Sequence, residues 1–96
     1  MISGVNQAEE EIIKGILSEY PYEFFCYGSR VKGDFTVSSD LDILLKSDKP
    51  VDYVVIAVIE QKFNESKLPY RVNITDYNVI DKYFFDLIKK DLVKIK

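Results

Sequence analysis

The stretch that decides the fold spans residues 28–42 and reads GSRVKGDFTVSSDLD. An aromatic and apolar run, YEFFCY at residues 22–27, precedes it, and an apolar run at residues 43–45 follows it. Short apolar runs that end at glycine or at polar residues are typical of buried strands. The sequence therefore predicts two strands, at residues 22–27 and 40–45, joined by a polar loop with room for one helical turn.

Two acidic side chains fall on one face of the second strand. Side chains two residues apart in a strand point the same way, so Asp40 and Asp42 are expected to lie roughly 6–7 Å apart along it. Leu41 would face the core. Adjacent carboxylates repel each other, and a divalent cation bound through oxygen removes that repulsion. The alternative is a solvated strand edge whose acids bind nothing.

The loop that begins at residue 28 has the composition of a phosphate-binding loop. Gly28 directly follows the first strand and allows another group to approach the backbone closely. Ser29 offers a hydroxyl and a backbone N–H at the start of the expected helical turn, a common setting for phosphate. Arg30 and Lys32 add positive charge, and for them phosphate contact and plain surface charge both stay open. An anion-binding loop beside an acidic pair is typical of phosphoryl or nucleotidyl transfer.

Hydrophobic periodicity outside this stretch predicts three helices, at residues 7–20, 50–64 and 79–92. Asn6 and Asn78 are the expected N-caps of the first and the last. The middle helix contains a run rich in β-branched residues, so a strand stays open there as the alternative.

The order of these elements predicts the fold class. Residues 70–75 favour a third strand, which gives the order helix, strand, loop, strand, helix, strand, helix. We expect one domain, residues 1–96, of the α/β (α+β) class, with a small mixed three-stranded sheet flanked by helices.

Composition excludes several kinds of chemistry. The 96 residues include no histidine and one cysteine, Cys26, which removes Ser-His-Asp and Cys-His catalysis, imidazole metal sites and internal disulfides. The formal net charge of −3 argues against a general nucleic-acid binder. No apolar run approaches the roughly 20 residues of a membrane span, and the first residues lack the pattern of a signal peptide. We therefore expect a cytoplasmic protein.

The spacing of the polar residues resembles a known family. Gly28-Ser29, ten intervening residues and then Asp40-Leu41-Asp42 resemble the Gly-Ser-x10-Asp-x-Asp signature of the minimal nucleotidyltransferases. This family belongs to the DNA polymerase beta-like nucleotidyltransferase superfamily, and the similarity extends over nearly the whole chain. It implies a nucleotidyltransferase fold in which Gly28 and Ser29 hold the triphosphate of ATP. It also implies that Asp40 and Asp42 are catalytic and bind Mg²⁺.

One position departs from the family pattern. The family's third carboxylate lies in the third strand, where this sequence has Asn73. Asparagine offers an oxygen ligand but cannot accept a proton as a general base. We therefore expect two metal ligands and a weak third at Asn73, with a structural hydrogen bond as the alternative for this residue. Asp76 follows three residues later, where a turn or helix-start acid is the favoured interpretation.

The resemblance also implies a biological role. Members of the family commonly act as antitoxins beside a HEPN-domain toxin, and some transfer AMP from ATP to a tyrosine of the toxin. We expect a Mg²⁺-dependent protein adenylyltransferase with ATP as substrate and a HEPN toxin as partner. Because Asn73 replaces a carboxylate, neutralisation of the partner by binding alone is the alternative. A small-molecule nucleotidyltransferase is a weaker hypothesis, since no separate acceptor-binding domain is evident, and the oligomeric state stays open.

Overall fold

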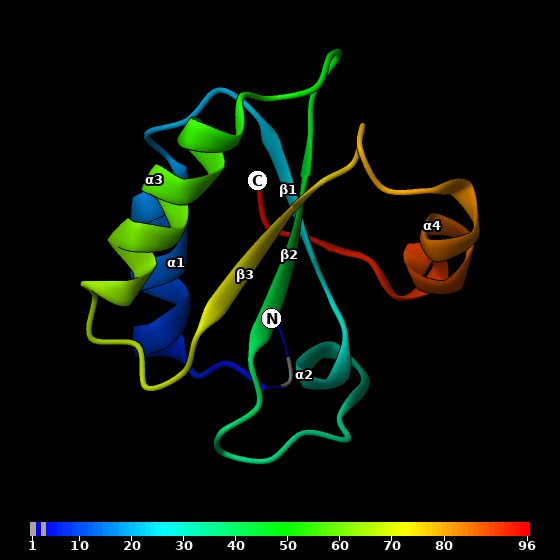
Figure 1. Cartoon of the computed structure of the whole chain (residues 1–96). Coiled ribbons are helices and arrows are strands. Elements are labelled where there is room, and N and C mark those ends of the chain that lie inside the picture. Colours follow the sequence, from blue (N-terminus) through cyan, green and yellow to red (C-terminus); the bar gives the residue numbers. More distant parts are fainter. Residues whose placement is uncertain (1, 3) are drawn as a thin grey trace.

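A four-stranded mixed sheet in the order β3-β2-β1-β4 organises the chain. The computed structural model describes residue 2 and residues 4–96 (Figure 1). Along the chain the elements are α1 (Gln7–Leu17), β1 (Glu23–Tyr27), α2 (Ser29–Lys32), β2 (Leu41–Lys46), α3 (Tyr53–Asn64), β3 (Val72–Asp76), α4 (Lys82–Ile88), the 3-10 helix η1 (Lys89–Asp91) and β4 (Val93–Lys94). The expected class, a mixed sheet flanked by helices, is confirmed. None of the helices in these described residues is long and apolar enough to cross a membrane.

The strand pairings bring the loop after β1 next to the starts of β2 and β3. β1 pairs antiparallel with β2, whereas β2 and β3 run parallel. Tyr27 is the register partner of Asp42, and Asp42 is the register partner of Asn73. The end of β1 and the beginnings of β2 and β3 therefore share one corner of the sheet, at the end where α2 lies (Figure 1).

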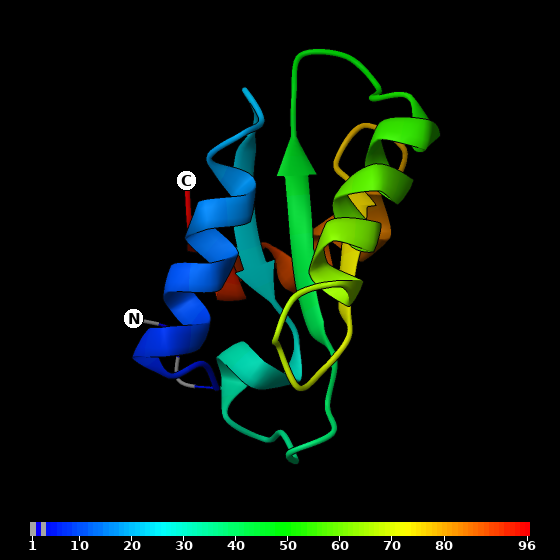
Figure 2. The same ribbon diagram turned by 90° about the vertical axis from the view of Figure 1, so that its left-hand side faces the viewer.

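The two faces of the sheet carry different kinds of side chain. Helices α1 and α3 cover one face, and α4 lies on the opposite side (Figure 1, Figure 2). Because side chains alternate along a strand, every second strand residue packs against α1 and α3. This core contains Ile13, Leu17, Phe24, Cys26, Leu41, Ile43, Leu45, Ile59, Phe63, Val72 and Ile74. The intervening residues Tyr27, Asp42 and Asn73 belong to the other face.

The N-terminal starts of α1 and α3 have local explanations. Asn6 caps α1 as expected, and it forms a capping box with Glu9. The helix over residues 50–64 is also confirmed, and the strand interpretation of its β-branched run is wrong. α3 follows Asp52, whose side chain accepts a hydrogen bond from Val54 N at 2.9 Å. The buried stripe of α3, which ends at Phe63, outweighs the weak β preference of its valines and isoleucines.

Two expectations near the C-terminal end are corrected. Asn78 does not cap the last helix, because the N-cap of α4 is Asp81. The Asn78 amide instead donates to Ser47 O at 2.7 Å. The sheet also has a fourth strand, β4, which pairs antiparallel with β1 near Cys26. A two-residue strand has no periodicity, so the sequence predicted only three strands.

Asp76 is a structural residue of β3. Its side chain is 5% exposed and lies on the core face, opposite to that of Asn73. One carboxylate oxygen accepts a hydrogen bond from Val51 N at 2.7 Å, and the other accepts from Asn78 N at 2.9 Å. Asp76 thereby ties the segment before α3 to the turn after β3.

Replacing this carboxylate leaves two backbone donors without their acceptor. We expect Asp76→Ala to lower the free energy of unfolding in urea by about 1–3 kcal/mol. Asp48→Ala, which removes an exposed acid, should change it by less than about 0.5 kcal/mol. Equal effects of the two substitutions would show that Asp76 has no special structural role.

Candidate active site

The loop after β1 lies directly against a carboxylate of β2. Gly28 is the N-cap of α2 and has φ +89° and ψ −165°, a conformation that favours glycine. A Cβ added at Gly28 would lie 2.6 Å from Asp42 Oδ2. Any other residue would therefore displace the Asp42 side chain. Glycine is what allows the expected phosphate-binding loop and the acidic pair to share one corner.

Asparagine joins the two acids at this corner. Asn73 Nδ2 donates to Asp40 Oδ2 at 3.1 Å and to Asp42 Oδ1 at 3.2 Å. The structure thus brings Asp40, Asp42 and Asn73 together, with both carboxylates meeting a single amide nitrogen. Asp40 is exposed and Asp42 is half-buried, so the pair opens to solvent on the Asp40 side.

The donor set suits a hard divalent cation that also binds substrate oxygens. Mg²⁺ prefers oxygen ligands and is usually held by one or two carboxylates together with substrate phosphates. Within residue 2 and residues 4–96, no cluster of three or more acidic, histidine or cysteine side chains could hold a metal. Asn73 presents its NH₂ to the acids, so its oxygen would have to turn inward to act as a third ligand. Two carboxylates therefore fit Mg²⁺ when phosphate oxygens and water complete its octahedral coordination shell.

Ser29 lies beside Gly28 at the start of α2. The Gly28 carbonyl accepts hydrogen bonds from Val31 N at 3.1 Å and from Lys32 N at 3.0 Å, which fixes the helical turn at the corner. Ser29 is half-buried and Lys32 is exposed. Gly28, Ser29 and Lys32 stay predictions for binding the phosphates of a nucleotide.

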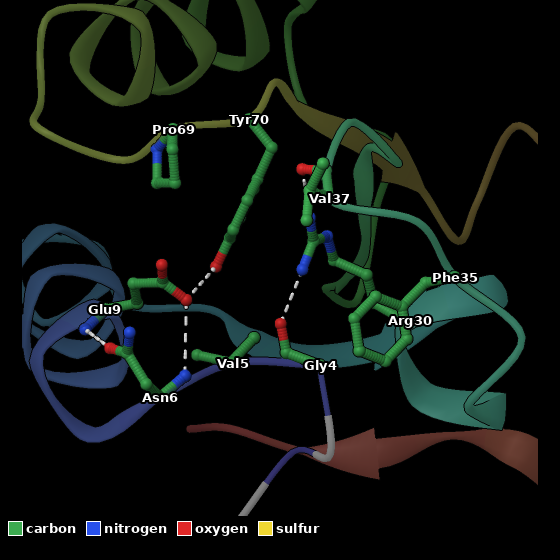
Figure 3. A pocket seen from close by; sticks show the side chains of 9 residues that line it. All are labelled: Gly4, Val5, Asn6, Glu9, Arg30, Phe35, Val37, Pro69 and Tyr70. Carbon is green, nitrogen blue, oxygen red and sulfur yellow. Dashed lines mark hydrogen bonds between the residues drawn. The ribbon is translucent and has the colours of Figure 1, made fainter.

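Arg30 has a different role from the predicted phosphate contact. It is 4% exposed, and its side chain points into the protein, where it donates to Gly4 O at 2.5 Å (Figure 3). It also donates to Ser39 O at 2.7 Å. A guanidinium that is buried among backbone carbonyls does not face a triphosphate in solvent. Arg30 is therefore not placed to bind the phosphates of a nucleotide.

Burial and charge both act on the carboxylate at the centre of the site. Burial raises the pKa of Asp42, the neighbouring Asp40 raises it further, and the hydrogen bond from Asn73 lowers it. Tyr27, which the sequence interpretation missed, lies beside Asp42 in the sheet, and its hydroxyl is 3.1 Å from Thr75 Oγ1. Burial raises the pKa of Tyr27 as well. Its position, one residue before Gly28, was the feature of the sequence that could have placed Tyr27 near the site.

The raised pKa of Asp42 predicts a pH-dependent effect of its substitution. The folded state binds the Asp42 proton more tightly than the unfolded state, so the ionised carboxylate destabilises the metal-free fold, and this cost disappears below about pH 4. We expect Asp42→Asn to be more stable than the parent at pH 7 by about 0.5–1 kcal/mol, or roughly 2–8 °C in Tm. The difference should close as the solution is acidified.

Asp48→Asn, at an exposed acid, is the matched control and should show no such pH-dependent difference. A stabilisation by Asp42→Asn that persisted undiminished at low pH would mean that the charge of Asp42 is not its source.

Comparisons with known proteins show which family the chain belongs to. A family model described as a nucleotidyltransferase domain matches residues 9–96. A relative from Haemophilus influenzae, named as a probable protein adenylyltransferase, MntA, is 34% identical over 94 residues, which cover 96% of this chain and 82% of the relative. A crystal structure from Sulfolobus solfataricus, described as a nucleotidyltransferase, has a TM-score of 0.52 and 26% identity, and the match covers 88% of this chain and 73% of that one. The chain therefore belongs to the nucleotidyltransferase domain family and is a nucleotidyltransferase enzyme.

Proposed function

We propose that this nucleotidyltransferase is a protein adenylyltransferase, which transfers AMP from ATP to a tyrosine hydroxyl of a HEPN-domain toxin and so acts as an antitoxin. The observation that carries the proposal is the corner where Gly28 lies against Asp42 and where Asp40 meets the same asparagine. The identity with a relative named as a protein adenylyltransferase supports a protein acceptor. The Gly-Ser-x10-Asp-x-Asp spacing supports the toxin as partner, because it resembles that of the minimal nucleotidyltransferases.

The residues at this corner would bind and orient the nucleotide. Gly28 and Ser29 would hold the phosphate tail at the start of α2, with exposed Lys32 as an additional cation. Asp40 and Asp42 would hold Mg²⁺, which supplies charge neutralisation on the phosphates when bound. The acceptor hydroxyl gives its proton to water as its oxygen forms a bond to the α-phosphorus, the bond from that phosphorus to the β-phosphate oxygen breaks, and pyrophosphate leaves. Positioning and charge stabilisation provide most of the catalysis in such transfers.

Asn73 makes this transfer slower than in a site with three carboxylates. An amide cannot accept the proton that the attacking hydroxyl releases. Its NH₂ instead holds the two acids in place, at 3.1 Å and 3.2 Å. The same contact favours the second candidate function, in which the chain neutralises its partner by binding alone.

Labelled ATP separates the two candidates. The protein is incubated with ATP labelled at the α-phosphate, Mg²⁺ and the product of the neighbouring gene, and mass spectrometry locates any AMP. We expect label on a tyrosine of the partner, and a loss of about 100-fold or more in rate for Asp42→Asn but not for Asp48→Asn. Asn73→Asp, which restores a third carboxylate, should raise the rate by about 10-fold or more.

The outcomes differ between the candidates. A tight complex without label, in the parent and in Asn73→Asp, would favour neutralisation by binding alone. A partner that is neither labelled nor bound would contradict both the toxin partner and the antitoxin role.

A further inference from the structure

One guanidinium connects several backbone segments around the site. Arg30 Nη1 donates to Gly4 O at 2.5 Å and Nη2 donates to Val37 O at 3.0 Å (Figure 3). Nε donates to Ser39 O at 2.7 Å. A weaker contact from Nη2 reaches Thr36 O at 3.4 Å. Because the side chain is 4% exposed, these carbonyls replace water around its charge.

Two aromatic rings hold the plane of this guanidinium. Arg30 Cζ lies 3.7 Å from the ring centroid of Tyr70 and 5.1 Å from that of Phe35, within the range of cation–π attraction. Tyr70 is itself anchored, because its hydroxyl donates to Glu9 Oε1 at 3.1 Å. Both rings and Glu9 line a cavity of about 390 Å³ beside Arg30 (Figure 3).

Gly4, in the segment before α1, also packs closely against Arg30. A Cβ added at Gly4 would lie 2.9 Å from both Arg30 Cβ and Arg30 O. The segment before α1 therefore lies directly on α2, and this contact leaves the guanidinium little freedom to swing toward solvent.

Three residues of this network lie close in sequence to residues of the candidate site. Arg30 directly follows Ser29, Ser39 directly precedes Asp40, and Tyr70 is in the segment that leads to Asn73. Residues 33–40 contain no helix or strand, so the hydrogen bonds of the sheet do not fix the approach to Asp40. The guanidinium thus links this loop to the phosphate-loop candidate and to the segment that precedes β3.

We propose that Arg30 is a positioning residue, which holds the loop that leads to Asp40 against the turn that carries Gly28 and Ser29. By binding the carbonyls that precede Asp40 and by stacking on Tyr70, it places Asp40 near Asp42 and Asn73. Lysine keeps the charge but lacks the planar fork of nitrogens that meets several carbonyls and two rings at once. The consequence for catalysis rests on the proposed function, whereas the ordering of residues 33–40 does not.

Hydrogen exchange of the metal-free protein tests the ordering directly. We expect Arg30→Lys and Arg30→Gln to accelerate amide exchange at residues 36–41 by about 10-fold or more, without accelerating it in β1. Leu41 N, which donates to Arg71 O at 2.8 Å, is the most informative amide of this segment. Arg71→Gln is the matched control, because Arg71 is the other arginine of the sequence and its side chain is exposed.

The dependence of nucleotidyl transfer on Mn²⁺, used in place of Mg²⁺, tests the effect of Arg30 on the proposed metal site. In Arg30→Lys, the Mn²⁺ concentration for half-maximal rate should rise by about 10- to 100-fold, the rate at saturating Mn²⁺ should largely recover, and the KM for ATP should change less. In Arg71→Gln the Mn²⁺ concentration for half-maximal rate should be unchanged. Because Mn²⁺ binding also rescues a fold that is merely destabilised, circular dichroism of the metal-free protein is the control: a shift in Arg30→Lys that is fully folded without Mn²⁺ reports positioning.

Several results would overturn the role of Arg30. The positioning role is excluded if amide exchange at residues 36–41 of Arg30→Lys stays at the parent rate. It is also excluded if exchange becomes faster throughout the chain. If Arg30→Gln does not fold, Arg30→Lys decides, because it retains charge and much of the length. If the parent transfers no nucleotide, the proposed function fails while the exchange data still decide the role of Arg30.

Discussion

Two negatively charged side chains held at one amide group are the constraint on which the site depends. Asp40 and Asp42 both accept from Asn73 Nδ2 because the parallel register of β2 and β3 sets Asp42 opposite Asn73. Gly28 completes the arrangement, since only a residue without a Cβ lets the chain leave β1 beside Asp42. The amide offsets part of the repulsion between the acids, and the rest favours a cation at the same place.

The alternation of side chains along β3 separates stability from function. Asp76, on the core face, gives both carboxylate oxygens to backbone N–H groups and is a structural residue. Asn73, on the other face, gives its amide to the acidic pair. The apolar core against α1 and α3 therefore fixes the strands independently of the charge at the site. This division explains how a partly buried, mutually repelling acid pair persists in a domain of 96 residues.

Local sequence patterns were enough to predict most of the fold and which residues lie together at the candidate site. Glycine after an aromatic strand, and acids at alternate positions of the next one, predicted that Gly28 and Asp42 share a corner. The role of Arg30 could not be predicted, because its acceptor Gly4 and its stacking partner Tyr70 are distant in sequence and meet only in the fold. Similarly, β4 has too few residues to produce a pattern, and its formation depends on the free edge of β1.

The location of a bound paramagnetic cation tests the central claim most directly. Mn²⁺ is titrated into the ¹⁵N-labelled protein with a non-hydrolysable ATP analogue, and the broadening of each amide signal is followed by NMR. If Asp40 and Asp42 hold the cation beside the phosphate loop, the signals of Ser29, Asp42 and Asn73 disappear first. Signals near Asp48, beyond the other end of β2, should stay sharp at the same Mn²⁺ concentration. First broadening away from the Gly28 corner, or equal broadening throughout the chain, would contradict the assigned site.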